Sequence, residues 1–280
     1  MPGLSTRQKI AVATLASRLV RAARSLVGLS SRGEFTRRGI RWDLDLTEGI
    51  DFAIWLFGRF EPDAFSAYHA RLESRDIVLD IGANIGAHTL PFAQCISPAG
   101  RVLAFEPTVY AFKKLNRHRE LNPELGKLID ARQTLLMDSA SAVIPEMIAS
   151  AWPLEPQEGL HPDHLGRMES TAGAQAATLD ALLANEPRID FIKLDVDGHE
   201  LAVLRGAHAT LARCKPPILL ELCPQVCIEH GHTFADLVSE ILGAGYRFER
   251  FDGSALPSDP AELERLIPAK GGLNVFALPS

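Results

Sequence analysis

The chain has 280 residues, which is long enough for one large α/β domain with an appendage. Its composition is that of an ordinary globular protein, and no apolar stretch approaches the ~20 residues of a membrane-spanning helix. The net charge of −6 disfavours a nucleic-acid partner, and four cysteines without a framework spacing predict free thiols and a cytoplasmic protein.

Positive charge gathers in the first 41 residues, which hold nine Arg or Lys and a single acid, Glu34. Residues 7–27 form a basic amphipathic pattern, because their apolar residues fall mainly on one helical face with Arg18, Arg21 and Arg24 beside it. Such a helix either makes peripheral contact with an anionic membrane or packs on its own domain or a second subunit. The sequence leaves these alternatives and the oligomeric state open.

The next segments predict a cap in front of the main domain. Apolar alternation over residues 36–46 is typical of a half-buried strand, and the aromatic-rich stretch from Ile50 to Phe60 indicates a helical cap near a ligand mouth. A second helix is expected over residues 63–72. We therefore divide the chain into a basic helix and cap, residues 1–72, and a main domain, residues 73–280.

The main domain begins with a strand and a glycine turn. The apolar, β-branched run from Ile77 to Ile81 is too short for a helix, so it predicts a buried parallel strand. Gly82 and Gly86 follow in a tight turn with Asp80 before it, and a helix begins near His88. A strand, a glycine turn and a helix N-terminus together form a binding place for a polar ligand.

The residues of this turn favour one class of ligand. Asn84 replaces the second glycine of the nicotinamide fingerprint, and the Asp80 carboxylate repels phosphate and attracts an ammonium group. The Asp-x-Gly-x-Asn-x-Gly pattern instead resembles the first motif of S-adenosylmethionine (SAM)-dependent methyltransferases. On this resemblance the cofactor-binding residues of the turn are Asp80, Gly82, Ala83, Asn84, Gly86 and His88.

The next two strands supply further cofactor candidates. Glu106 ends an apolar run about twenty residues beyond the turn, where an acid can accept hydrogen bonds from both ribose hydroxyls. This feature is shared with nicotinamide enzymes. Pro107 is placed to wall the adenosine. A third strand is expected from Leu128 to Leu136, and Gln133 near its end is assigned to the adenine by position.

Residues 138–177 contain many Gly and Pro residues, and a long irregular segment inside a compact domain is usually functional. We expect mixed strand and loop material that covers the active site as a substrate-covering insertion. His161 and His164 have no partner acid or cysteine nearby, so no metal site is predicted there.

A second group of polar residues follows the fourth strand, expected over residues 188–195. Asp195, Asp197 and Glu200 lie within six residues, so their carboxylates should perturb one another's proton affinities. Asp195 is the first candidate for a catalytic base or for the group that orients a hydroxyl, and His199 is the second.

A fifth strand over residues 215–222 ends near Glu221, beside Asp195 in a parallel sheet. These two carboxylates could also hold a divalent cation such as Mg²⁺ through oxygen ligands. No other metal-binding residues are predicted, because the Cys223-x-x-x-Cys227 spacing matches no common zinc site.

Five blocks occur in order: residues 78–86, 100–107, 178–180, 192–200 and 205–207, with 218–221 continuing the pattern. Together they resemble the FkbM-type methyltransferase family, although Asp197 stands where that family usually has Glu. The resemblance implies a Rossmann-like, doubly wound α/β fold whose mainly parallel seven-stranded sheet has an antiparallel last strand. It also implies SAM-dependent O-methylation of a small-molecule or glycan hydroxyl, on a sugar, glycolipid or natural product. A non-catalytic SAM- or nucleotide-binding regulatory protein and a nucleotide-dependent oxidoreductase are the alternatives.

Overall fold

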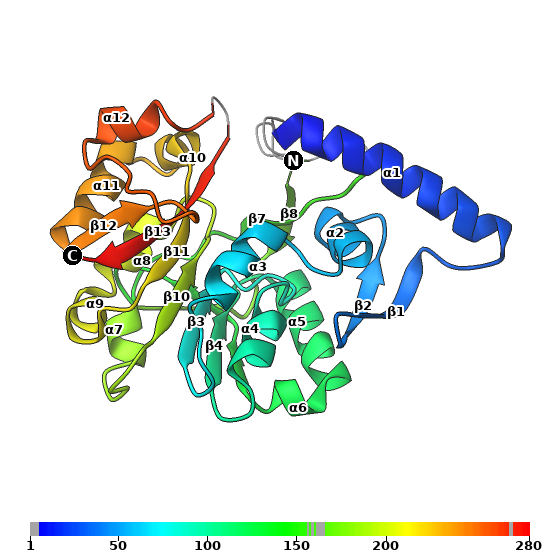
Figure 1. Ribbon diagram of the computed structural model, residues 1–280, viewed down its shortest axis with the longest axis horizontal. Coiled ribbons are helices and arrows are strands. Elements are labelled where there is room, and N and C mark those ends of the chain that lie inside the picture. The colour runs from blue at the N-terminus through cyan, green and yellow to red at the C-terminus, as the bar shows by residue number, and fades with distance from the viewer. Residues whose placement is uncertain (1–5, 156, 158–159, 161–165, 269–270) are drawn as a thin grey trace.

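The computed structural model describes residues 6–155, 157, 160, 166–268 and 271–280. Its centre is a seven-stranded sheet with the strand order β12-β13-β11-β10-β3-β4-β5 (Figure 1). Its strands are β3 (Ile77–Ile81), β4 (Arg101–Phe105), β5 (Ile129–Arg132), β10 (Phe191–Leu194), β11 (Ile218–Leu222), β12 (Tyr246–Glu249) and β13 (Leu273–Pro279). β13 pairs antiparallel with both neighbours, whereas the other pairs are parallel. The predicted doubly wound fold with an antiparallel last strand is confirmed.

The central strands read as continuous apolar runs because helices cover both faces of the sheet. Leu79 and Ile81 of β3 face one core, and Val78 faces the other. The first core is packed by residues of α7 (Leu179–Leu182), α8 (Glu200–Arg205), α9 (His208–Cys214), α10 (Pro224–Glu229), α11 (Phe234–Gly243) and α12 (Pro260–Glu264). The second is packed by α2 (Gly49–Phe57), α3 (Pro62–His69), α4 (Thr89–Ile96), α5 (Val109–Leu121) and α6 (Pro123–Gly126).

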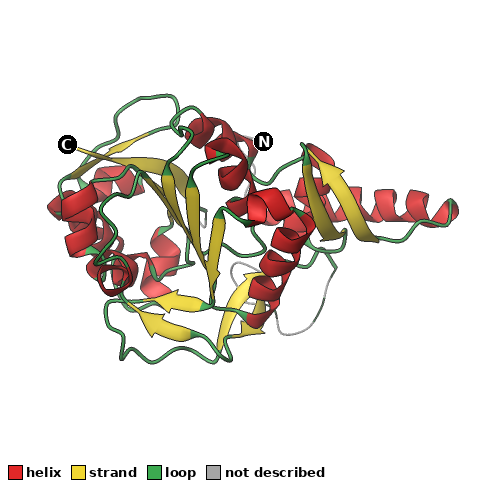
Figure 2. Cartoon of the chain, turned by 90° about the horizontal axis from the view of Figure 1, so that it is seen from below, coloured by secondary structure: helices red, strands yellow, loops and turns green. Residues whose placement is uncertain are grey.

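The N-terminal appendage consists of α1 (Thr6–Leu26) and a hairpin of β1 (Arg32–Arg37) and β2 (Ile40–Asp45). Figure 2 shows α1 and the hairpin projecting from the body. The predicted alternation is confirmed for β2, but its partner β1 was missed because β1 is polar and nowhere fully buried. Among the described residues, no helix is both long enough and apolar enough to cross a membrane.

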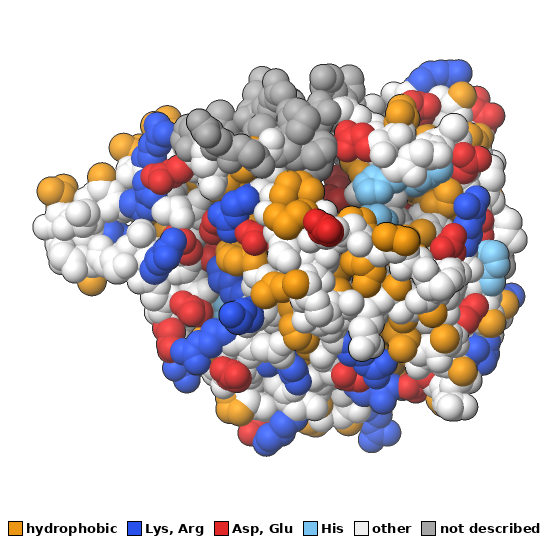
Figure 3. Space-filling view, turned by 180° about the vertical axis from the view of Figure 1, so that it is seen from behind, with side chains coloured by type: hydrophobic (Ala, Val, Ile, Leu, Met, Phe, Trp, Pro, Cys, Tyr) orange, Lys and Arg blue, Asp and Glu red, His pale blue; other side chains and the backbone are white. Residues whose placement is uncertain are grey.

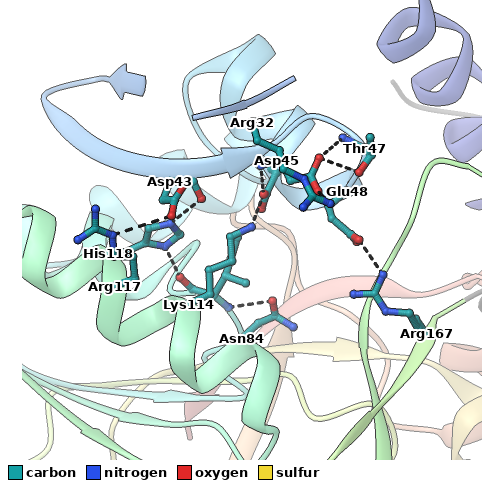
Figure 4. A network of polar contacts seen from close by, with 12 residues as sticks. Arg32, Asp43, Asp45, Thr47, Glu48, Asn84, Lys114, Arg117, His118 and Arg167 are labelled. Atoms are coloured by element: carbon teal, nitrogen blue, oxygen red, sulfur yellow. Dashed lines mark hydrogen bonds and ion pairs between the residues drawn. The ribbon is translucent and has the colours of Figure 1, made fainter. Parts of the chain in front are cut away.

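Polar contacts hold this appendage against the main domain (Figure 4). The ring of His118 on α5 lies 2.7 Å from the carbonyl oxygen of Ile85, in the glycine turn, and 3.1 Å from that of Asp43 on β2. Asp51 on α2 pairs with Lys114 on α5, and burial raises the pKa of the Asp51 carboxyl to about 6. The cap and the glycine turn therefore share one scaffold, α5.

The expected single strand from Leu128 to Leu136 is wrong, because the chain leaves the main sheet at Gln133. β5 ends at Arg132, and β6 (Thr134–Leu136) pairs with β9 (Gln175–Ala177) in a separate two-stranded sheet. Between them, β7 (Met147–Ala151) pairs antiparallel with β8 (Arg167–Ser170). The prediction of mixed strand and loop over 138–177 is confirmed where the structure describes it, and His161 and His164 lie outside the described residues.

Candidate functional site

The glycine turn after β3 requires glycine for two separate reasons. Gly82 and Gly86 have φ of +81° and +86°, in the left-handed region that favours glycine. A Cβ on Gly82 would lie 1.7 Å from the carbonyl oxygen of Asp195, and one on Gly86 would lie 2.7 Å from Leu115. The turn is therefore packed directly against the end of β10, which brings Asp195 beside it.

Asn84 is also left-handed, with φ of +47°, a conformation that asparagine tolerates better than most residues. Its side-chain amide donates to the carbonyl oxygen of Ser150 on β7, at 2.9 Å. The residue that replaces the second fingerprint glycine thus fastens the turn to the segment over residues 138–177.

Glu106, directly after β4, is only 3% exposed and accepts hydrogen bonds through both carboxylate oxygens. Oε1 accepts from the backbone N–H and the hydroxyl of Thr108, at 2.8 and 2.6 Å, and Oε2 accepts from the Asn84 N–H at 2.9 Å. Burial raises the pKa of this carboxyl, and the hydrogen bonds from Thr108 oppose the rise. Because Oε2 uses one acceptor position, it retains another for a ligand hydroxyl.

These elements surround a cavity of about 690 Å³, which is within the range for small-molecule sites. The predicted site residues that line it are Gly82, Ala83, Asn84, His88, Glu106, Pro107, Asp195 and His199. Ile148 to Ser150 of β7 and the following Trp152 to Leu154 form another part of its wall. Figure 3 shows acidic and histidine side chains gathered at a hollow on one face of the molecule.

Three predicted cofactor residues, all in the described part of the chain, lie outside this wall: Asp80, Gly86 and Gln133. Asp80 is fully buried and accepts a 2.6 Å hydrogen bond from the Thr89 hydroxyl. The Gln133 amide donates to the carbonyl oxygen of Pro107 at 3.2 Å, while Thr134 and the two following leucines line the cavity.

A buried lysine that the sequence reasoning did not select stands at the end of β10. Lys193 is 4% exposed, and its ammonium lies 2.9 Å from Asp195 and 4.0 Å from Asp80. Burial lowers its pKa, but the two carboxylates outweigh this effect and raise it overall. A lysine inside the apolar run Phe-Ile-Lys-Leu was the available sequence signal.

Carboxyl groups crowd the same end of the cavity. Burial, and next the charge of Asp195, raises the pKa values of Asp197 and Glu221 well above their usual range. Glu200 accepts from the N–H groups of Val196 and Gly198. Its pKa is raised by burial to about 7. Burial and mutual repulsion thus favour the protonated forms of these carboxyl groups.

His199 lines the cavity with its ring packed edge-on against His230, at 4.4 Å between ring centroids. Burial, and next the neighbouring His230, lowers the His199 pKa to about 4. The imidazole is therefore neutral near pH 7 and able to accept a proton, although it is a weak base.

His88 and Glu61 both line the cavity and form a histidine–carboxylate pair there. The His88 ring nitrogen Nε2 lies 3.3 Å from Glu61, which has φ of +42° at the start of α3. No periodicity in the sequence could have indicated Glu61, because the contact depends on how α3 packs.

Within the described ranges, no three His, Cys, Asp or Glu side chains assemble a group that could hold a metal ion. Asp195 and Glu221 both line the cavity. Cys223 and Cys227 are free thiols in the structure, as are Cys95 and Cys214.

Comparison with known proteins gives one family match: the model of the methyltransferase FkbM domain matches residues 80–248. The hexuronic acid methyltransferase AglP of Haloferax volcanii is 30% identical over 152 residues, which cover 53% of this chain and 56% of AglP. The chain thus matches about half the length of this curated relative.

Among solved structures, the methyltransferase FkbM from Methylobacillus flagellatus is similar with a TM-score of 0.46 and 15% identity, covering 74% of this chain and 44% of that one. Magnesium protoporphyrin IX methyltransferase from Synechocystis, solved with bound SAM, has a TM-score of 0.42 and 11% identity, with coverages of 78% and 76%.

Proposed function

Because the chain belongs to the FkbM methyltransferase family, we propose that it catalyses SAM-dependent methylation of a hydroxyl group. The observation that carries this proposal is the Glu106 carboxylate, fixed by four hydrogen bonds beside the glycine turn with one acceptor position left on Oε2. An acid at this place suits the ribose of a nucleoside cofactor. Family membership favours methyl transfer over the oxidoreductase and non-catalytic alternatives.

The residues of the cavity fit a cationic nucleoside cofactor. SAM, when bound, supplies a methyl group on a positively charged sulfonium. Asp195, Asp197 and Glu221 line the cavity, and Lys193 is the one Lys or Arg among its described lining residues. Carboxyl oxygens accept hydrogen bonds in either protonation state, so this end of the cavity suits the ammonium group of the cofactor. In this proposal Glu106 and Pro107 hold the nucleoside, and the turn residues Gly82 to Asn84 contact the cofactor. Asp80 does not touch the cofactor but positions Lys193 and Thr89.

Asp195 is the proposed group that accepts or orients the acceptor hydroxyl proton. Its side chain is 37% exposed, and Lys193 holds one carboxylate oxygen at 2.9 Å, so the other oxygen is available for a hydroxyl. His199 is the second candidate, because its neutral ring lines the same cavity. We expect Asp195→Asn to lower turnover at least tenfold with little change in cofactor affinity. Normal turnover of this variant on an identified acceptor would remove Asp195 from the mechanism.

The acceptor proposed is a sugar or another glycan hydroxyl, in keeping with the name of the relative AglP. The segment over residues 138–177 is proposed to cover it, since β7 and residues 152–154 wall the cavity. The main domain then spans residues 73–280 behind the cap of residues 1–72. A divalent cation between Asp195 and Glu221 stays a prediction.

The test is calorimetric titration with S-adenosylhomocysteine, with and without magnesium. We expect micromolar binding by the wild type and at least tenfold weaker binding by Glu106→Gln, which keeps the size of the side chain but loses the carboxylate. Glu264→Gln is the matched control, because Glu264 is an exposed acid on α12. Equal binding by both variants, or no binding by a folded wild type, would contradict the proposal. A magnesium requirement would support the cation at Asp195 and Glu221.

A further inference from the structure

The outward face of α1 carries an uninterrupted set of exposed apolar side chains. Six residues fall within an arc of about 100° on a helical wheel: Val12, Leu15, Leu19, Ala22, Ala23 and Leu26. Leu15, Leu19 and Leu26 are 63%, 65% and 88% exposed. Val27 and Leu29 continue the apolar surface beyond the helix end. An apolar face of this size marks an interaction surface.

This face is not needed to hold the helix on its own domain, because the opposite face does so. Ala13, Ala16 and Val20 pack against the second core, and the buried Ser17 hydroxyl donates to the carbonyl oxygen of Leu46 at 2.6 Å. Packing on its own domain, one of the alternatives that the sequence left open for this helix, thus accounts for the inner face of α1 only.

The positive charge around α1 distinguishes between a second copy of the chain and a lipid surface as the partner of the outer face. Arg18 borders the apolar arc, is exposed, and makes no ion pair within the described part of the chain. Residues 1–41 hold nine cations and one acid in a chain of net charge −6. Two copies packed through α1 would bring these like-charged segments together, whereas an anionic lipid surface complements them.

We propose that α1 docks on an anionic lipid surface, with its outward apolar face in the headgroup region. Ala13, on the inner face of the same helix, lines the cavity. The cavity therefore lies about one helix diameter, ~10 Å, from the lipid. If the chain has the proposed function, its acceptor is then a hydroxyl on a membrane-attached molecule; this part of the inference rests on the proposed function.

The test is co-sedimentation with phosphatidylcholine vesicles made with and without phosphatidylglycerol. We expect wild-type protein to bind the anionic vesicles more tightly, and Leu15→Glu/Leu19→Glu to bind them on the order of tenfold more weakly or worse. Ile228→Glu/Leu266→Glu is the matched control, because it adds the same charge at exposed apolar sites outside α1 and should bind like the wild type. Titration with S-adenosylhomocysteine should be equal in all three proteins, so loss of docking and loss of the proposed function are distinguishable.

A second measurement places the helix itself. Tryptophan emission of Leu19→Trp should shift to the blue on anionic vesicles and be quenched by brominated lipid, relative to the wild type. The proposal is overturned if the wild type ignores the anionic vesicles, or if the Leu15→Glu/Leu19→Glu protein binds them as well as the control. A dimer in light scattering that this variant dissolves, without vesicle binding, would assign the face to a second copy instead.

Discussion

Replacing Lys193 by methionine tests the charge balance at the end of β10. Lys193 and Asp80 are 4% and 0% exposed, and their charged atoms lie 4.0 Å apart. At an effective dielectric constant of about 20 this pair attracts by about 4 kcal/mol. Methionine keeps most of the side-chain volume but leaves the Asp80 carboxylate buried without a cation. Breaking a buried pair in this way costs about 3–5 kcal/mol, so the free energy of unfolding should fall by that amount.

The assay is urea denaturation without ligand, followed by circular dichroism. The double variant Lys193→Met/Asp80→Asn is the decisive control, because it also removes the stranded charge while an amide oxygen can still accept from the Thr89 hydroxyl. We expect the double variant to be about 2 kcal/mol more stable than Lys193→Met. A loss below about 1 kcal/mol in the single variant, or a further loss in the double variant, would refute the reasoning.

Two more predictions concern the glycine turn and its support. Gly82→Ala should destabilise the fold by about 3 kcal/mol or more in the same assay, because it adds a clash with Asp195 to an unfavourable φ. Gly253→Ala, with φ of +86° and open space, should cost only about 1 kcal/mol, and equal losses would count against the clash. Burial lowers the His118 pKa to about 4, so the neutral ring stabilises the fold above pH 6.5 and this contribution is lost as pH falls toward 4. His118→Gln should therefore reduce the fall in unfolding free energy between pH 7 and pH 5 by about 2 kcal/mol, and an unchanged fall in urea titrations at both pH values would contradict this.

The sequence predicted best what local pattern determines. The bounds of β3 follow from a β-branched run that glycine stops. Thr178 likewise is a residue type that favours a helix N-cap, and its hydroxyl accepts from the Ala181 N–H at 3.1 Å. The break at Gln133 was not predicted because the segments before and after it, β5 and β6, are both extended. Their side-chain alternation cannot show that the chain changes sheets.

The residues of the candidate site also divide into those that local sequence pattern predicts and those that it does not. Glu106 and Asp195 were found because residues at the carboxyl ends of parallel strands must meet at one edge of the sheet. Lys193 and Glu61 were missed because their roles come from burial and from packing between distant segments. Asp80 shows the converse, since this residue of the predicted motif does not line the cavity.

The hydrogen bonds of Ser150 connect β7 to the glycine turn and to the residues that hold Glu106. β7 is therefore placed to couple the proposed cofactor site with the proposed acceptor site. The Ser150 carbonyl oxygen accepts from the Asn84 amide at 2.9 Å, and the Ser150 hydroxyl lies 2.9 Å from that of Thr108, which in turn holds Glu106. The same strand, β7, walls the cavity through Ile148 and Ala149. A shift of β7 on acceptor binding would change cofactor affinity by some factor, and thermodynamic reciprocity would require cofactor binding to change acceptor affinity by the same factor.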